Sequence, residues 1–415
     1  MKEENKSVKN FPNSGDLGIP KLRFTEFGIE KWETIRLGEI ATFTKGKGIS
    51  KSDIDENGET ECIRYGELYT FYEEVISEIK SKTNTDISSL VLSEANDVII
   101  PASGETQIDI ATASCVLKSG VALGGDLNVI KTKNNGVFLS YYLNSKKKLE
   151  IAKLSQGISV VHLYSSQLAL LNLKLPQLEE QNKLANFLSL LNSRIQTQKK
   201  IIEKLETLMI DSRENLFSQK IRFKDDDFSN WEQKKLGDIL IESNEKSTKN
   251  NQYRVISSTA KGLFYQDEYF TRDIASQDNT GYKVLKKEQL VFSPQNLWLG
   301  NINVNTSFEI GLVSPSYKIF DFNTSLTSYS FCNFFLKTSI MLFEYAQSSI
   351  QGASVVRRNL DLNMFFNIKI LLPSINEQTK IANFLSSIQE KIETEKQILE
   401  KLELQKKFLL SNLFI

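Results

Sequence analysis

The chain has 415 residues, of which 40% are apolar and 25% charged, a globular composition with room for two or more domains. It contains no run of about 18 apolar residues, so no membrane-spanning helix is predicted. Its 51 basic residues balance 51 acidic ones, so the net charge gives no support for nucleic-acid binding. The three cysteines, Cys62, Cys115 and Cys332, lie far apart, which excludes a local zinc site or disulfide framework and favours a cytoplasmic location.

In chain order, a polar segment over residues 1–19 lacks the apolar core of a signal peptide, and we expect a loose tail. A first domain is expected over 20–174. Its short β-branched and aromatic runs between turn residues predict strands, and 139–154 predicts a helix. A second domain of the same kind is expected over 220–371, with a helix over 329–347. Each domain is therefore predicted to be mixed α+β.

An internal repeat organises the chain. Residues 175–217 and 372–414 align without a gap at an offset of 197, with about half of the positions identical. The segments 21–40 and 220–239 also match, each with a tryptophan followed by a Leu-Gly pair. Identity fades inside the domains although the order of elements persists. The similar helices and entry segments can bind similar partners, whereas the divergent domain interiors can bind different targets.

Two long helices are predicted, over 175–219 and 372–415. Their apolar residues alternate at four- and three-residue spacings, as in a coiled-coil seam. Because a helix about 60 Å long cannot be covered by one such domain, we expect the helices to pack antiparallel on each other, with a pseudo-two-fold relation between the domains. Ser374 and Glu377 fit a capping box at the second helix start. The predicted seam residues are Leu188, Leu191, Ile195, Ile202, Leu205, Leu385, Ile388, Ile392, Leu399 and Leu402.

Signatures of catalysis are missing from the sequence. It has no Walker A loop, no glycine-rich dinucleotide fingerprint, no nucleophile elbow and no HExxH motif. His162 is the only histidine, and a lone histidine is usually structural or solvated. We therefore do not expect an enzyme that acts alone.

The doubled motif resembles the specificity (S) subunits of Type I restriction–modification systems. Their pattern is an entry segment like WETIRLGEI, a variable target-recognition domain, and a helix that opens LPxLxEQxxIAxFL. The two helix openings here are LPQLEEQNKLANFL and LPSINEQTKIANFL. The resemblance covers about residues 20–415, and Leu184 departs from it where Ile381 has the usual residue.

The resemblance implies a division of labour between subunits. Each domain reads one half of a split DNA site, and the helices set the distance between the halves. Two methyltransferase (M) subunits bind the two repeats, and restriction (R) subunits join for ATP-driven translocation and cleavage. S-adenosylmethionine, ATP and magnesium would belong to those partners, so no cofactor or metal is expected for this chain. Two alternatives stay open: a coiled-coil scaffold displaying protein- or sugar-binding domains, and a specificity module that acts with a methylase alone.

Candidate DNA contacts begin with two loops and two strand ends. The basic loop 44–51 and its counterpart 244–251 are expected to contact phosphates. The segments 103–106 and 295–298 follow equivalent strands and are expected at loop tips. For all four, a solvated loop is the plain structural alternative, and Trp298 fits a buried core position equally well.

Two further segments, 156–162 and 351–358, lie just before the long helices. They carry Gln and Arg side chains, which can bond adenine and guanine edges bidentately, and glycines that allow close backbone approach. Their structural alternative is a turn that introduces a strand. The candidate DNA-binding residues are Lys45, Lys47, Lys51, Ser103, Thr106, Gln156, Gly157, Ser159, His162, Lys246, Lys249, Gln295, Asn296, Gln351, Gly352, Ser354, Arg357 and Arg358.

Overall fold

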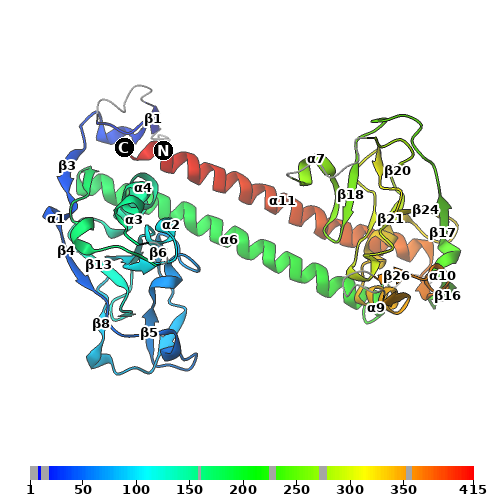
Figure 1. Cartoon of the computed structure of the whole chain (residues 1–415), viewed down its shortest axis with the longest axis horizontal. Helices are drawn as coiled ribbons and strands as arrows, with labels where there is room; N and C mark the ends of the chain where they lie inside the picture. Colours follow the sequence, from blue (N-terminus) through cyan, green and yellow to red (C-terminus); the bar gives the residue numbers. More distant parts are fainter. Residues whose placement is uncertain (1–7, 11–17, 158–159, 224–229, 271–277, 352–357) are drawn as a thin grey trace, which may run out of the picture. The chain divides into compact units, whose positions relative to one another are not determined.

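The chain divides into two compact units in the computed structural model (Figure 1). Unit 1 comprises 1–199 with 397–415, and unit 2 comprises 200–396. Each unit combines an α+β domain with a stretch of both long helices, α6 (Leu178–Phe217) and α11 (Ile375–Leu413), which confirms the predicted fold class. The structure describes residues 8–10, 18–157, 160–223, 230–270, 278–351 and 358–415.

The domain of unit 1 is built on a five-stranded sheet of order β4-β13-β9-β11-β6, antiparallel except for the β11–β6 pair. The central strand β9 is buried along its whole length, as its run of apolar residues predicts. The strands are β4 (Ala41–Lys45), β6 (Val75–Ile76), β9 (Asp97–Pro101), β11 (Ser114–Val116) and β13 (Leu127–Thr132).

Helices and a second sheet cover the two faces of this sheet. The expected helix over 139–154 is observed as α3 (Gly136–Tyr142), a π-helical turn, and α4 (Lys148–Leu154), and α3 packs on β9 and β11. A four-stranded sheet of order β7-β5-β12-β8 closes a smaller core that includes Ile63, Ile99 and Val129. Its strands are β5 (Thr60–Ile63), β7 (Ser81–Thr83), β8 (Val91–Leu92) and β12 (Ala122–Leu123).

The domain of unit 2 repeats the same order of elements. A four-stranded sheet of order β17-β24-β21-β22 matches β4-β13-β9-β11, and two helices again follow. A hairpin of β18 and β19 and a pair of β20 and β23 complete this domain. The elements are β17 (Leu240–Ser243), β18 (Ile256–Thr259), β19 (Gly262–Tyr265), β20 (Lys283–Lys286), β21 (Leu290–Phe292), β22 (Ile302–Val304), β23 (Ile310–Val313), β24 (Lys318–Phe322), α8 (Tyr329–Phe335) and α9 (Ser339–Gln347).

In both units the entry segment pairs with the strand that leads into the long helix. In unit 1, β3 (Glu33–Arg36) is antiparallel to β15 (Asn172–Leu175). In unit 2, β16 (Glu232–Lys235) is antiparallel to β27 (Lys369–Leu372). Within each unit, strand pairing thus joins the entry segment to the segment that leads into the long helix, and these are the parts of the chain that match best between the two copies of the repeat.

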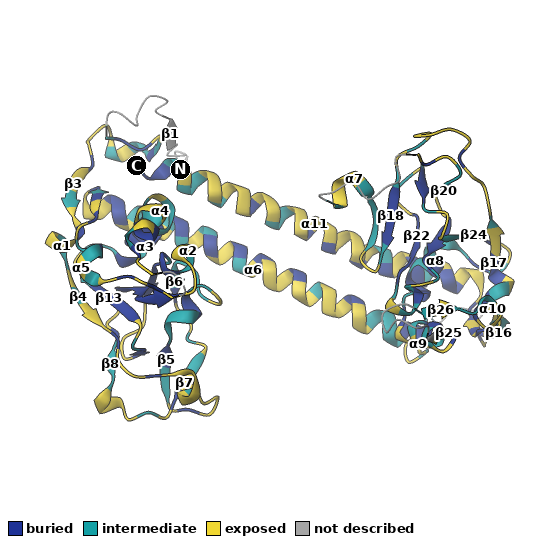
Figure 2. Cartoon of the chain, viewed as in Figure 1, coloured by how far each residue is buried: buried dark blue, intermediate teal, exposed yellow. Residues whose placement is uncertain are grey.

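The long helices run antiparallel inside each unit. In unit 1, Lys199 lies 3.3 Å from Glu403, and Lys406 Nζ donates to Asn192 Oδ1 at 2.9 Å. Residue numbers therefore rise along α6 where they fall along α11. In unit 2, Lys396 and Glu206 form an ion pair of 2.6 Å in the same sense. Buried positions recur along both helices between exposed ones (Figure 2).

The predicted seam residues differ in burial. Leu191, Leu205 and Leu399 are only half-buried. Next to Leu191 the contact is polar, because Asn192 is buried and accepts the hydrogen bond from Lys406. The buried seam residues are Leu188, Ile195, Ile202, Leu385, Ile388, Ile392 and Leu402.

The predicted capping box is only half formed. The Ser374 hydroxyl accepts from the Glu377 amide at 3.3 Å, as expected of an N-cap. The Glu377 carboxylate is instead directed to Arg222 and Trp231, so the reciprocal half of the prediction was wrong. A buried charged partner offers this carboxylate a stronger hydrogen bond than the helix-start amide.

Candidate nucleic-acid interface

The same buried ion pair fastens each domain to the start of its long helix. Arg23 donates from Nε and Nη2 to the two carboxylate oxygens of Glu180 at 2.8 and 2.6 Å. Arg222 makes the same two bonds to Glu377 at 3.0 and 2.7 Å. Both pairs have the fork geometry that makes Arg–carboxylate contacts strong and directional. We call them the Arg–Glu locks.

The glutamine after each lock glutamate ties the helix start to the domain. Gln181 donates to the Pro176 carbonyl, and its own oxygen accepts from an amide at the start of α3. Gln378 repeats this with the Pro373 carbonyl and an amide just before α8. Of the residues in these contacts, the sequence singled out Glu377 alone, and in a different role. Their signal was the Glu-Gln pair shared by both helix openings and the arginine shared by both entry segments.

The divergent parts of the domain in unit 1 meet at one place. Strand β10 (Ser103–Gly104) pairs antiparallel with β14 (Val161–His162), and Gln156 bridges His162 through two backbone hydrogen bonds of 2.9 and 2.7 Å. The segments 103–106 and 156–162 were predicted separately, and the structure brings them side by side. Their exposed side chains include Gln156 and His162, while Ser103 is buried.

Two candidates at this place have structural roles of their own. The Thr106 hydroxyl caps α2 (Gln107–Ile110), accepting from the Asp109 amide at 3.1 Å and donating to its carboxylate at 2.6 Å. Gly157 has φ +127°, and a Cβ there would lie 2.0 Å from the Val160 carbonyl oxygen. Both residues therefore fix the local backbone where the segments 103–106 and 156–162 meet, and this role does not depend on a ligand.

The basic loop of unit 1 lies at the same end of the sheet. The Gly46 amide donates to the Leu127 carbonyl, and the Ala102 amide donates to the neighbouring Asp126 carbonyl. The loop and the start of β10 are therefore held by consecutive residues. The candidates Lys45, Lys47 and Lys51 are all exposed, and the contact of Lys45 with Asp126, at 3.8 Å, is a weak surface ion pair.

Unit 2 brings its corresponding tips together in a different way. Strands β25 (Ser349–Gln351) and β26 (Arg358–Leu360) form a hairpin that pairs Gln351 with Arg358. The guanidinium of Arg358 stacks on the half-buried Trp298, 4.4 Å from the ring centre. Trp298 lies in a short 3-10 turn (Leu297–Leu299), and the candidates Gln295, which is exposed, and Asn296, which is half-buried, come just before it.

The stacked pair has two hydrogen-bond donors without a partner among the described residues. Arg358 Nε and Trp298 Nε1 are both buried and have no hydrogen-bond partner within the described part of the chain. A buried donor without a partner costs about 1–3 kcal/mol. An arginine held flat on an aromatic face keeps its planar fork ordered for a bidentate contact. The ordered plane of the guanidinium, rather than its buried Nε, suits an acceptor pair from outside the chain, such as the guanine edge.

Two of the remaining candidates are exposed lysines, and four lie outside the residues that the structure describes. Lys246 and Lys249 are exposed on the loop that follows β17. Ser159, Gly352, Ser354 and Arg357 lie outside the described residues.

The three thiols are buried and poorly suited to chemistry. Burial raises the pKa of Cys62 to about 11 and those of Cys115 and Cys332 to about 12. Over the ranges that the structure describes, no group of three His, Cys, Asp or Glu side chains is arranged to hold a metal ion. The described helices also include none with the length and apolarity needed to cross a bilayer.

Comparisons with known proteins agree on one family. Residues 29–207 and 228–404 each match the model of the Type I restriction modification DNA specificity domain. The chain is 23% identical over 433 residues to the Type I restriction enzyme MjaVIII specificity subunit of Methanocaldococcus jannaschii, covering 96% of this chain and 93% of that one. It is 26% identical over 189 residues to the MjaIX specificity subunit of the same organism, covering 40% of this chain and 44% of the relative. Its fold resembles the crystal structure of the Type-I restriction-modification system S subunit from M. genitalium, with a TM-score of 0.61 at 18% identity, covering 96% of this chain and 99% of that one.

Proposed function

This chain belongs to the family of Type I restriction modification DNA specificity domains, and on that premise we propose that it is the non-catalytic, DNA-reading subunit of a Type I complex. Each unit would read one half of a bipartite double-stranded DNA site. The observation that carries the proposal is a contrast within the repeat. Both units attach their domain with the same Arg–Glu lock, whereas the tips that meet at the domain surface differ in structure and chemistry.

The tips supply groups that distinguish bases. In unit 2, the ordered guanidinium of Arg358 would bond the O6 and N7 acceptors of a guanine in the major groove. In unit 1, Gln156 offers an amide, which suits adenine, and His162 lies beside it. Lys45, Lys47 and Lys51, held at the same sheet end by the loop contacts, would bind phosphates and fix the register.

The two long helices would hold the two readers apart and dock the partners. Leu178 and Ile375 occupy equivalent positions at the starts of α6 and α11, and they are 48% and 42% exposed. Equivalent exposed apolar positions suit two copies of one partner, which we propose to be two methyltransferase (M) subunits. Restriction (R) subunits would join the full complex in the cytoplasm. S-adenosylmethionine, ATP and magnesium would be bound by these partners.

Methylome sequencing tests this proposal. Cells expressing the chain with its cognate methyltransferase should methylate one bipartite motif, two short specific sequences separated by an unread spacer. Cells expressing the methyltransferase alone should lack that methylation. A continuous motif, or methylation that does not depend on the chain, would contradict the proposal.

A further inference from the structure

A cavity of about 460 Å³ lies in unit 2 where the domain packs on α6 and α11. Its charged lining residues are Arg213, Lys261 and Lys337, and among the described residues that line it none is Asp or Glu. Further polar lining comes from hydroxyls and amides, and Phe264 forms part of the wall. These polar residues are Asn303, Thr306, Ser307, Asn333 and Gln389.

Two of the cations that line the cavity, Arg213 and Lys337, are half-buried. Burial, together with the smaller effect of the neighbouring charge of Arg213, lowers the pKa of Lys337 to about 8. Lys337 Nζ is fixed by a hydrogen bond of 2.9 Å to Asn303 Oδ1, a neutral partner. Like charges that line one cavity repel each other and so disfavour the folded chain.

The arginine also has an unsatisfied donor. Arg213 Nε is buried and has no hydrogen-bond partner within the described residues. Its ion pair with Glu214 is long, at 3.8 Å, and Glu214 itself accepts from the Ser339 hydroxyl at 2.8 Å. The charge of Arg213 is therefore only weakly compensated by protein groups.

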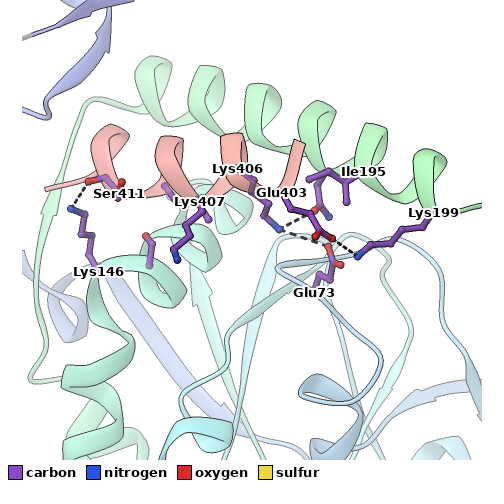
Figure 3. Close-up of a pocket in the computed structure, with 11 residues that line it drawn as sticks. Glu73, Lys146, Ile195, Lys199, Glu403, Lys406, Lys407 and Ser411 are labelled. Carbon is purple, nitrogen blue, oxygen red and sulfur yellow. Dashed lines mark hydrogen bonds and ion pairs between the residues drawn. The ribbon is translucent and has the colours of Figure 1, made fainter. Parts of the chain in front are cut away.

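The corresponding cavity of unit 1 provides an internal comparison. It also has a volume of about 460 Å³, and Asn192 lines it at the position equivalent to Gln389. Here acidic residues pair with two of the four lysines that line the cavity (Figure 3). Lys199 pairs with Glu403 at 3.3 Å, and Lys406 lies 3.0 Å from Glu74 and 3.8 Å from Glu73. The repeat thus has two cavities at equivalent positions: the one in unit 1 has glutamates in its lining, and the one in unit 2 has neither Asp nor Glu among its described lining residues.

We propose that the cavity of unit 2 binds a phosphate group, carried by a free nucleotide or by a nucleic-acid backbone. The guanidinium fork of Arg213 fits two phosphate oxygens, and the Lys337 ammonium supplies a compact second charge. The volume exceeds that of a single phosphate and lies in the range of small-molecule sites. A bound dianion would satisfy Arg213 Nε and offset the repulsion between the two cations. This inference goes beyond the reading of bases and does not depend on it.

Thermal unfolding of the full chain with inorganic phosphate tests the proposal, with sodium chloride at equal ionic strength as the reference. Phosphate should raise the Tm of the wild-type chain saturably, because a ligand that binds only the folded state stabilises it. Arg213→Gln and Lys337→Met should each lower the phosphate affinity at least tenfold. Lys337→Met should unfold at no lower temperature than wild type without phosphate, because it removes a buried charge and keeps the volume. Lys204→Gln, which removes an exposed lysine of α6 outside the cavity lining, should bind phosphate as wild type does.

A second measurement distinguishes the two sources of phosphate. If the group belongs to DNA, Arg213→Gln should reduce the salt dependence of DNA binding by the methyltransferase complex by about one unit of slope. If the group belongs to a free nucleotide, adenosine monophosphate should bind more tightly than inorganic phosphate, and the DNA slope should not change. The proposal is overturned if phosphate stabilises the wild-type chain no more than chloride does, or stabilises Arg213→Gln and Lys337→Met as strongly as wild type.

Discussion

The guanidinium of Arg358 lies 4.4 Å from the centre of the Trp298 ring, and this contact joins two segments that are far apart in the chain. One follows β21, and the other precedes the strand that leads into α11. In unit 1 the equivalent segments meet through backbone pairing of β10 with β14. Each unit therefore brings its divergent segments together, and each does so by different contacts.

Replacing Arg358 should relax base discrimination in one half-site. Arg358→Ala should reduce selectivity at one position by about 1–3 kcal/mol, the usual value of a bidentate base contact. Arg358→Lys keeps the charge but loses the fork, so it should lose nearly as much selectivity while losing less total affinity. Methylome sequencing of each variant measures both half-sites at once. Unchanged selectivity with weaker binding would instead identify Arg358 as a phosphate contact.

Removing one member of an Arg–Glu lock should destabilise its unit. Glu180→Ala and Glu377→Ala each leave an arginine that is almost buried without its partner, which costs about 3–5 kcal/mol. Glu377 also accepts from Trp231 Nε1 at 3.1 Å, whereas Trp32 Nε1 has no partner among the described residues, so the loss should be larger in unit 2. Urea unfolding of the alanine variants measures these losses, and urea unfolding of Arg222→Met, of Glu377→Leu and of the two combined measures the coupling. If the double variant loses the sum of the two single effects, the lock contributes no coupling energy.

The sequence predicted the elements that recur in the internal repeat, but it did not predict the contacts between residues far apart in the chain. The two helices, the α+β class and the matching strands β9 and β21 followed from periodicity and from the internal alignment. The lock between Arg23 and Glu180 joins residues 157 positions apart, and no local pattern encodes such a contact. For the same reason Glu377 was assigned to a capping box, because its buried partners were invisible in the local sequence. The stacking of Arg358 on Trp298 likewise depends on how two loops fold over one sheet end.

The helix seam should be sensitive to charge in proportion to burial. Ile388→Asp places an unpaired carboxylate at a position that is 7% exposed, which costs several kcal/mol and should unfold or aggregate the chain. Leu191→Asp should cost clearly less, because Leu191 is half-buried next to the polar Asn192–Lys406 contact. Thermal unfolding of the two variants compares them directly. Equal losses would mean that the polar contact does not moderate the seam at Leu191.

The two helix starts should each recruit one partner subunit. Native mass spectrometry of the chain co-expressed with its methyltransferase should give two M subunits per chain. Leu178→Arg and Ile375→Arg each place a charge on an exposed apolar position at one of the two equivalent sites, so each should shift the complex to one M subunit. Lys204→Gln is the control and should keep two. A wild-type complex with one M subunit would exclude docking at equivalent sites.

Specificity should be modular by half-site. Replacing residues 238–368 with those of a related specificity subunit exchanges the sheet and the Trp298–Arg358 tip. It leaves in place the β16–β27 pair and the Arg222–Glu377 lock, through which the domain attaches. Because α6 and α11 are untouched, the spacer between the half-sites should keep its length. The donor must retain a hydroxyl at Thr327, which donates to Gln378 at 2.9 Å and secures the helix start. Methylome sequencing of the hybrid should then show one new half-site, one unchanged half-site and the original spacer. A change in the half-site assigned to unit 1, or a new spacer length, would show that the domains do not read the halves independently.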